Sequence, residues 1–298
     1  MEGDQRIGAH AVLEGKHMFH YEHGVPVTLA VISAPPENGS RLPLLKPYPN
    51  WDMQKNSDNC STFQRVLDFK IGPNGRMWIL DSGTEMFSKT INKDQCLPRL
   101  VILDLEDGGK ILTNYIVPST VIDVNFIRHS LTNLMLDHDD GDFAYFTDNL
   151  NMAMVVFSLA LSPVNSKGDR VLYYVALFSD KVSEISTDVL KSQSLSPKIS
   201  QWVRELDIKI FSIQAEILVS NTGIMYIKSD PISWEPMLNI PPLFYETSPN
   251  IIQIKRLKVR NNRLIFDQEG NLCFINRFSS KIQTIKLKLE ESSEYYWD

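Results

Sequence analysis

"NGRMWILDSG", residues 74–83, contains the pattern that decides the fold. Asn74-Gly75 is a tight-turn pair, an apolar run from Met77 to Leu80 follows, and the stretch ends abruptly in Asp81-Ser82-Gly83. A turn followed by a short apolar run predicts a buried β-strand. Asp81 then has two interpretations: it is an acid or ligand at a site, or it is the polar end of a strand that repeats along the chain.

The surrounding segments have the same character. Turn residues separate them at Pro73-Asn74-Gly75 and at Asp107-Gly108-Gly109, and each is rich in β-branched and apolar residues. Together they predict a four-stranded meander, which is the unit of a propeller blade. The four segments are "RVLDFKIG" (65–72), "RMWILDSG" (76–83), "RLVILDLE" (99–106) and "ILTNYIVP" (111–118).

A turn followed by an apolar strand recurs along the chain. Its central positions, in chain order, are Phe19, Trp78, Tyr145, Tyr173, Tyr226 and Cys273. A four-stranded blade needs roughly 40–50 residues, and the interval of 28 residues between Tyr145 and Tyr173 is too short for one. We therefore predict an all-β fold, a six-bladed β-propeller formed by residues 1–298 as a single domain, with the region around residues 150–170 shortened. A β-sandwich is the alternative.

Composition excludes several classes of protein. The chain has 298 residues, of which 43% are hydrophobic and 22% are charged, which is typical of a globular protein. A formal net charge of −6 argues against general binding to nucleic acid or to an anionic membrane. No apolar run approaches the ~20 residues that a transmembrane helix needs.

Eight segments in one order resemble the insect yellow and major royal jelly protein family. They lie between about Gly24 and Lys281 and are "HGVPVTLAVIS", "LLKPYPNW", "DNCSTF", "GRMWILDSG", "CLPRLVILDL", "ALSPV", "LYYVALFSDKVSEIST" and "INRFSSK". The resemblance implies a secreted six-bladed β-propeller with a ligand pocket at one mouth of its channel. Members of the family include pigmentation proteins, nutritive jelly proteins and salivary proteins that bind biogenic amines.

The sequence departs from the family in four places. It begins inside the first blade, so that blade is expected to be incomplete, and it shows no signal peptide. A stretch usual in the family is missing between "VVFSL" and "ALSPV". Ser233-Trp234 stands where the family has a cysteine-tryptophan pair, and Cys273 stands where an aromatic residue is usual. Our hypothesis is a truncated gene model, a splice form or a degenerate paralogue.

The family resemblance also implies a disulfide between Cys60 and Cys96. Such a bond persists only in an oxidising compartment, so it supports an extracellular location. Two glycosylation acceptor patterns, at Asn38 and Asn59, agree with that location. We expect Cys273 to be an inert buried thiol.

The predicted ligand site rests on the resemblance as well. Asn276 and Phe278 match the element that lines the pocket of amine-binding relatives, and an amide with a phenyl face suits an aromatic or amine ligand. Lys255 and Arg256 stand where the relatives have small polar residues, and a cation there would repel a protonated amine. We therefore expect weak serotonin and dopamine binding unless an acid such as Asp81 compensates.

Other candidate groups favour a structural interpretation. Asp81 and Asp148 end matching strands and are expected to accept hydrogen bonds from turn amides. His17, His20 and His23 do not share one strand face, and "DHDDGD" (137–142) lacks the glycine position and glutamate of an EF-hand. We therefore expect no metal and no cofactor, and we identify no catalytic residue.

The sequence thus predicts a secreted, non-catalytic protein that binds a small aromatic or amine ligand or acts in cuticle pigmentation. A dopachrome-converting isomerase of the melanin pathway is the alternative. That chemistry needs a positioned base, and we identify none in the sequence. No nucleic-acid or membrane partner is expected, and the oligomeric state is left open.

Overall fold

The fold is described from a computed structural model of the chain. It describes residues 27–31, 46–54, 59–83, 96–118, 131–139, 141–148, 156–176, 179–192, 194, 196–210, 215–228, 253–257, 262–266, 272–276 and 281–285, the last four ranges by their backbone. The chain divides into two compact units, Met1–Met152 and Ala153–Asp298. Each unit is described separately.

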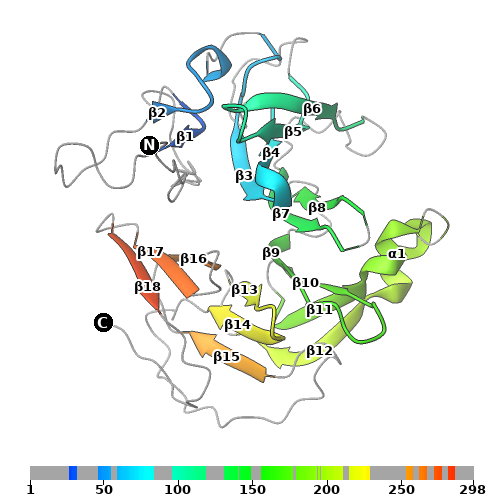
Figure 1. The fold of residues 1–298 in the computed structure, drawn as a ribbon. Helices are drawn as coiled ribbons and strands as arrows, with labels where there is room; N and C mark the ends of the chain where they lie inside the picture. The colour runs from blue at the N-terminus through cyan, green and yellow to red at the C-terminus, as the bar shows by residue number, and fades with distance from the viewer. Residues whose placement is uncertain are drawn as a thin grey trace. The chain divides into compact units, whose positions relative to one another are not determined.

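The first unit is built on the predicted meander (Figure 1). Its four antiparallel strands pair in sequence order and are β3 (Val66–Ile71), β4 (Arg76–Asp81), β5 (Arg99–Asp104) and β6 (Lys110–Ile116). Asn74 and Gly75, with φ of 62° and 63°, form the reversal between β3 and β4, within η3 (Pro73–Gly75). Asn and Gly enter this left-handed region most readily, so the turn residues set the β3–β4 pairing.

Strand β4 is buried on both faces. Met77 and Ile79 join one apolar cluster with Phe63 and Val101, whereas Trp78 and Leu80 join another with Leu131 and Leu134. Successive side chains of a strand point to opposite faces. The uninterrupted apolar run from Met77 to Leu80 is therefore the pattern of a strand with a core on each side.

The rest of the first unit consists of short elements around this sheet. β7 (Leu131–Asp137) and β8 (Phe143–Asp148) form a hairpin, and β1 (Ala30–Val31) pairs with β2 (Lys46–Pro47) ahead of η2 (Asp52–Gln54). Asp68 on β3 joins the hairpin to the meander, since its Oδ2 accepts a hydrogen bond from Leu134 N at 2.8 Å.

The second unit contains another four-stranded antiparallel sheet (Figure 1). Its strands are β9 (Val156–Leu161), β10 (Val171–Ala176), β11 (Lys181–Ser186) and β12 (Arg204–Lys209). Between β11 and β12 lie the short helices α1 (Thr187–Lys191) and η4 (Ser196–Trp202). Ser186 caps α1 by accepting a hydrogen bond from Asp188 N at 3.3 Å.

Two three-stranded sheets complete the described part of the second unit. One contains β13 (Glu216–Val219), β14 (Ile224–Lys228) and β15 (Gln253–Leu257), and the other contains β16 (Asn262–Phe266), β17 (Leu272–Asn276) and β18 (Lys281–Ile285). β15 runs parallel to β14, unlike the strands of a meander. A parallel pair needs a connection of a dozen or more residues, and β14 and β15 are far enough apart in sequence to allow one.

The all-β class predicted from sequence is therefore correct, because strands dominate the described residues and helices are few and short. The blade count, the closed propeller, the incomplete first blade and the single domain stay predictions. Within the described residues, the sheet that holds Tyr145 has two strands, β7 and β8, and the next sheet begins at Val156. This short sheet falls at the 28-residue interval between Tyr145 and Tyr173.

Candidate functional site

The Asp81 carboxylate lies at the end of β4 and is fully buried. Its Oδ1 accepts hydrogen bonds from Arg65 N at 2.8 Å and Gly83 N at 3.2 Å, and its Oδ2 accepts one from Gln64 N at 3.2 Å. A strand-end aspartate that accepts hydrogen bonds from turn amides satisfies backbone N–H groups that no neighbouring strand can pair. Asp81 was also a candidate ligand contact, and that role stays a prediction, although these donors occupy both of its oxygens.

Arg99, the first residue of β5, completes this group. Its Nε donates to Asp81 Oδ2 at 3.0 Å, and the two side chains are 4% and 0% exposed. Its Nη1 donates to Ser61 O at 3.3 Å and its Nη2 donates to Thr62 O. The guanidinium carbon also lies 5.7 Å from the centre of the Phe63 ring, within the range of a cation–π contact. One buried ion pair therefore holds the segment before β3 against β4 and β5.

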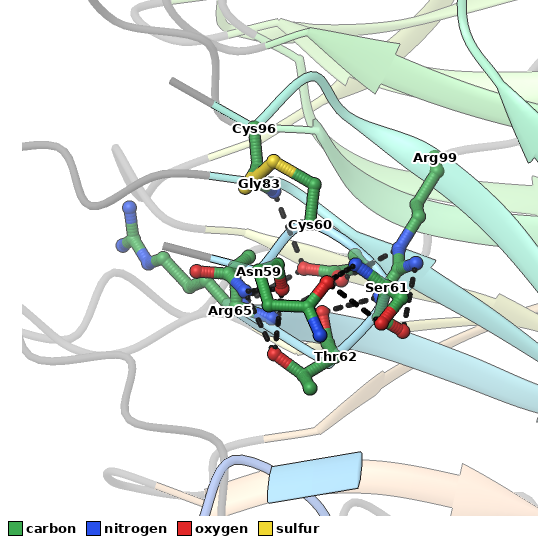
Figure 2. Close-up of a disulfide and its surroundings, with 10 residues drawn as sticks. Asn59, Cys60, Ser61, Thr62, Arg65, Gly83, Cys96 and Arg99 are labelled. Atoms are coloured by element: carbon green, nitrogen blue, oxygen red, sulfur yellow. Dashed lines mark hydrogen bonds and ion pairs between the residues drawn. A yellow bond between two sulfur atoms is a disulfide. The ribbon is translucent and has the colours of Figure 1, made fainter. Parts of the chain in front are cut away.

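The Cys60–Cys96 disulfide ties down the same segment (Figure 2). Cys60 precedes β3 and Cys96 precedes β5, and the two are 36 residues apart in sequence. The pair that the resemblance implies is thus bonded in the structure. Gly83, which lies beside it, has φ of +74°, and a Cβ at this position would collide with the Cys96 carbonyl oxygen. Only glycine fits this turn without strain.

A second polar group lies near the opposite end of β4. His138 Nδ1 and Asp142 Oδ1 are 2.6 Å apart in the β7–β8 hairpin, and the His138 ring meets the Trp78 ring edge-on with centroids 5.9 Å apart. Within the described structure, His138 Nε2 and Trp78 Nε1 are buried and make no hydrogen bond. The "DHDDGD" stretch therefore connects the two strands of a hairpin, and its His138 contacts β4.

The residues of the predicted pocket fall in different sheets. Lys255 and Arg256 lie in β15 and Asn276 ends β17, and these strands belong to separate sheets of the second unit. β15 ends at Leu257 and pairs with β14, whereas β16 begins at Asn262 and pairs with β17.

Several of the predicted residues lie outside the described part of the chain. Phe278, Asn38, His17, His20 and His23 lie outside the described residues, and so do the side chains of Lys255, Arg256 and Asn276. Asn59 is described and exposed. In the described part of the chain, no three His, Cys, Asp or Glu side chains gather as a metal ion would require. None of the described helices is long and apolar enough to cross a membrane.

Burial raises the pKa of three phenols. Burial raises the pKa of Tyr226 and, together with the Asp104 carboxylate, that of Tyr48 above the ordinary value of 10.0. Burial likewise raises the pKa of Tyr174. The hydrogen bond with Ser183 lowers this pKa in part, and the Glu205 carboxylate raises it by a smaller amount. At neutral pH these phenols can donate hydrogen bonds but cannot serve as general bases.

Sequence reasoning missed Arg99 and His138. Arg99 had a detectable signal, because a basic residue opens the strand that follows β4 in the meander and so lies opposite Asp81 in antiparallel register. His138 had no such signal, because its contact with Trp78 depends on the packing of one hairpin on another.

The described molecule is an all-β protein of small sheets, one of them held by a disulfide and a buried ion pair. Its sequence matches the major royal jelly protein family over residues 64–161 and 152–229, more than half of its length, and the chain belongs to this family. The two matched stretches overlap at residues 152–161, which include the junction of Leu159 and Ala160 where a stretch usual in the family is expected to be missing.

Individual relatives come from flies. The chain is 31% identical to dopaminechrome tautomerase of Drosophila melanogaster over 143 residues, which are 47% of this chain and 30% of that protein. It is 24% identical to protein yellow of Drosophila erecta over 215 residues, 58% of this chain and 39% of that protein. It is 25% identical to protein yellow of Drosophila madeirensis over 215 residues, which are 58% of this chain and 37% of that protein. The chain therefore spans less than half the length of the relatives it matches.

Proposed function

We propose that this protein is an extracellular, non-catalytic member of the yellow type that acts in pigmentation by binding a small aromatic ligand. The observation that carries the proposal is the similarity to protein yellow over 58% of the chain. The commitment of the Asp81 carboxylate to four structural donors supports a binding role over catalysis, since it removes this acid from the candidates for a base.

The ligand class follows from the predicted pocket residues. Asn276 and Phe278 offer an amide and a phenyl face, and Lys255 and Arg256 offer positive charge. The Asp81 carboxylate, the acid considered as a compensating charge, is already paired with Arg99. An uncharged or anionic aromatic compound, such as an oxidised catechol derivative, suits this set better than a protonated amine.

Calorimetry on the purified chain tests the ligand class. We expect dopamine to bind weakly, and we expect the double variant Lys255→Ala/Arg256→Ala to bind it about tenfold more tightly, a gain of about 1.4 kcal/mol. Lys167→Ala, which removes an exposed charge between β9 and β10, is the matched control and should change nothing. Tight dopamine binding by the unaltered chain would contradict the proposal.

A catalytic role is the second candidate, and the 31% identity to a dopaminechrome tautomerase favours it. The decay of the coloured aminochrome, followed by absorbance with the native protein and with heat-denatured protein, separates the two candidates. We expect equal rates in both samples. A faster decay with native protein would replace the binding proposal with the isomerase.

The extracellular location is part of the proposal. The disulfide supports it, because such bonds persist in oxidising compartments and are rare in the cytosol. Thiol labelling of the protein in its native tissue tests the location: we expect Cys60 and Cys96 to resist alkylation until a reductant is added.

A further inference from the structure

Asn59 opens an acceptor pattern for N-linked glycosylation, Asn59-Cys60-Ser61, whose middle residue is a disulfide cysteine. Asn59 is exposed, and its Oδ1 accepts hydrogen bonds from Ser61 N at 3.0 Å and from Ser61 Oγ at 2.8 Å. The amide oxygen thus faces Ser61, and Nδ2, the atom that a sugar would occupy, makes no hydrogen bond among the described residues. Figure 2 shows Asn59 and Ser61 beside the disulfide.

The folded loop holds both groups that a glycosyl transfer needs. The Asn59 carbonyl accepts hydrogen bonds from Thr62 N at 3.1 Å, Thr62 Oγ1 at 2.9 Å and Gln64 Nε2 at 3.2 Å. Arg99 holds the Ser61 carbonyl, and the Cys60–Cys96 bond anchors the middle of the pattern. A transferase that must extend this stretch and engage the Ser61 hydroxyl cannot do so once the loop has closed.

We propose that Asn59 is an N-glycosylation site that is modified before Cys60 bonds to Cys96, so that disulfide closure and glycan transfer compete. This inference rests on the proposed extracellular location. In the transfer, Asn59 Nδ2 bonds to the anomeric carbon of a lipid diphosphate-linked oligosaccharide and loses a proton. The carbon–oxygen bond to the diphosphate breaks, and the lipid diphosphate leaves with the electron pair.

The order of synthesis opens a window for the transfer. Cys96 follows Cys60 by 36 residues, which at a synthesis rate of about 5–20 residues per second corresponds to about 2–7 s. During this time Cys60 has no Cys96 to pair with. Afterwards the two thiols are oxidised by exchange with a disulfide of an oxidoreductase, which takes up their two electrons and two protons.

The experiment uses the full chain, fused to a cleavable secretion leader and expressed in insect cells. Mass spectrometry of the peptide that contains Asn59 measures the unmodified fraction in the medium and in the microsomal fraction. Cys96→Ser removes the disulfide partner and leaves the acceptor pattern intact. Cys273→Ser is the matched cysteine control, and Ser61→Ala destroys the pattern and should abolish the glycan.

We expect glycan at Asn59 in the unaltered chain and, because closure competes with transfer, an unmodified fraction that falls at least about twofold in Cys96→Ser. Cys273→Ser should match the unaltered chain. Unmodified Asn59 in every variant, or equal occupancy with and without Cys96, would overturn the inference. The added leader guarantees entry into the secretory pathway, so either result is independent of whether the native chain is secreted. The microsomal sample keeps the test valid if Cys96→Ser is retained in the cell.

Discussion

The two four-stranded sheets each join a carboxylate to an arginine across paired strands, but they bury the pair to different depths. Asp81 and Arg99 are register partners on β4 and β5, and their side chains are 0% and 4% exposed. Glu184 and Arg204 are register partners on β11 and β12, and theirs are 9% and 54% exposed. The same pairing is therefore buried in one sheet and half open to water in the other.

The difference lies in what else each pair holds. Asp81 has three backbone donors besides Arg99, and Arg99 also binds two backbone carbonyls. Glu184 Oε1 binds Arg204, while its Oε2 is buried and makes no hydrogen bond within the described structure. A buried pair stabilises a fold when hydrogen bonds satisfy its remaining atoms. The first pair meets this condition and organises a segment, whereas the second links two strands.

The largest effect is expected from Arg99→Met. The variant leaves the Asp81 carboxylate buried without its cation, and breaking such a pair costs about 3–5 kcal/mol. Urea denaturation followed by fluorescence measures the loss. Arg76→Met, on the neighbouring strand β4 and with a side chain that is 47% exposed, is the matched control and should change little. Equal midpoints for the two variants would show that the Asp81 pair contributes no more than a surface contact.

Removal of the disulfide comes next. On the loop-entropy model, a bridge across 36 residues contributes about 3–4 kcal/mol, so the double variant Cys60→Ser/Cys96→Ser should lose that amount. Thermal unfolding, with and without reductant, measures it. The double variant should also become insensitive to reductant. A reductant-sensitive melting temperature in that variant would mean that Cys273 forms a disulfide between two copies of the chain.

Two glycines separate backbone strain from crowding. Gly83 and Gly108 have φ of +74° and +61°, but a Cβ would collide with the Cys96 carbonyl oxygen at the first and meet nothing within 4 Å at the second. Gly108→Ala should cost about 1–2 kcal/mol for the left-handed backbone alone. Gly83→Ala should cost about 1 kcal/mol more. Equal midpoints in urea would indicate that the Cys96 segment moves aside freely.

The smallest effect is expected from Arg204→Met in the second sheet. Water replaces a half-exposed guanidinium readily, so the loss should be about 0.5–1 kcal/mol. The same urea titration should show a midpoint close to that of the unaltered chain, and high salt should reduce the difference further. A loss as large as that of Arg99→Met would erase the contrast between the two sheets.

Local sequence pattern was enough to predict the meander, but it did not predict the parallel strand pair of the second unit. The turn at Asn74-Gly75 and the run from Met77 to Leu80 predicted β4 and its hairpin correctly, because both signals lie within a few residues of the strand. The pairing of β15 with β14 was not predicted, since a parallel pair depends on a long connection.

The candidate site divides in the same way. Asp81 was recognised as a strand-end residue from its position alone, whereas its pairing with Arg99 follows only once β4 and β5 are placed in antiparallel register. The contact of His138 with Trp78 depends on how a separate hairpin packs. Sequence therefore identified the residues that end strands, and the structure was needed to show what they meet.

The burial of β4 on both sides limits how this protein can diverge. An ordinary half-buried strand has one solvent-exposed face on which substitutions accumulate with little cost. In β4, by contrast, each residue from Met77 to Leu80 is at most 6% exposed. A change in the size of any of them requires an accommodating change in one of two separate interiors. We expect this tetrapeptide to vary less among close homologues than the solvent-exposed outer strand β6 of the same sheet.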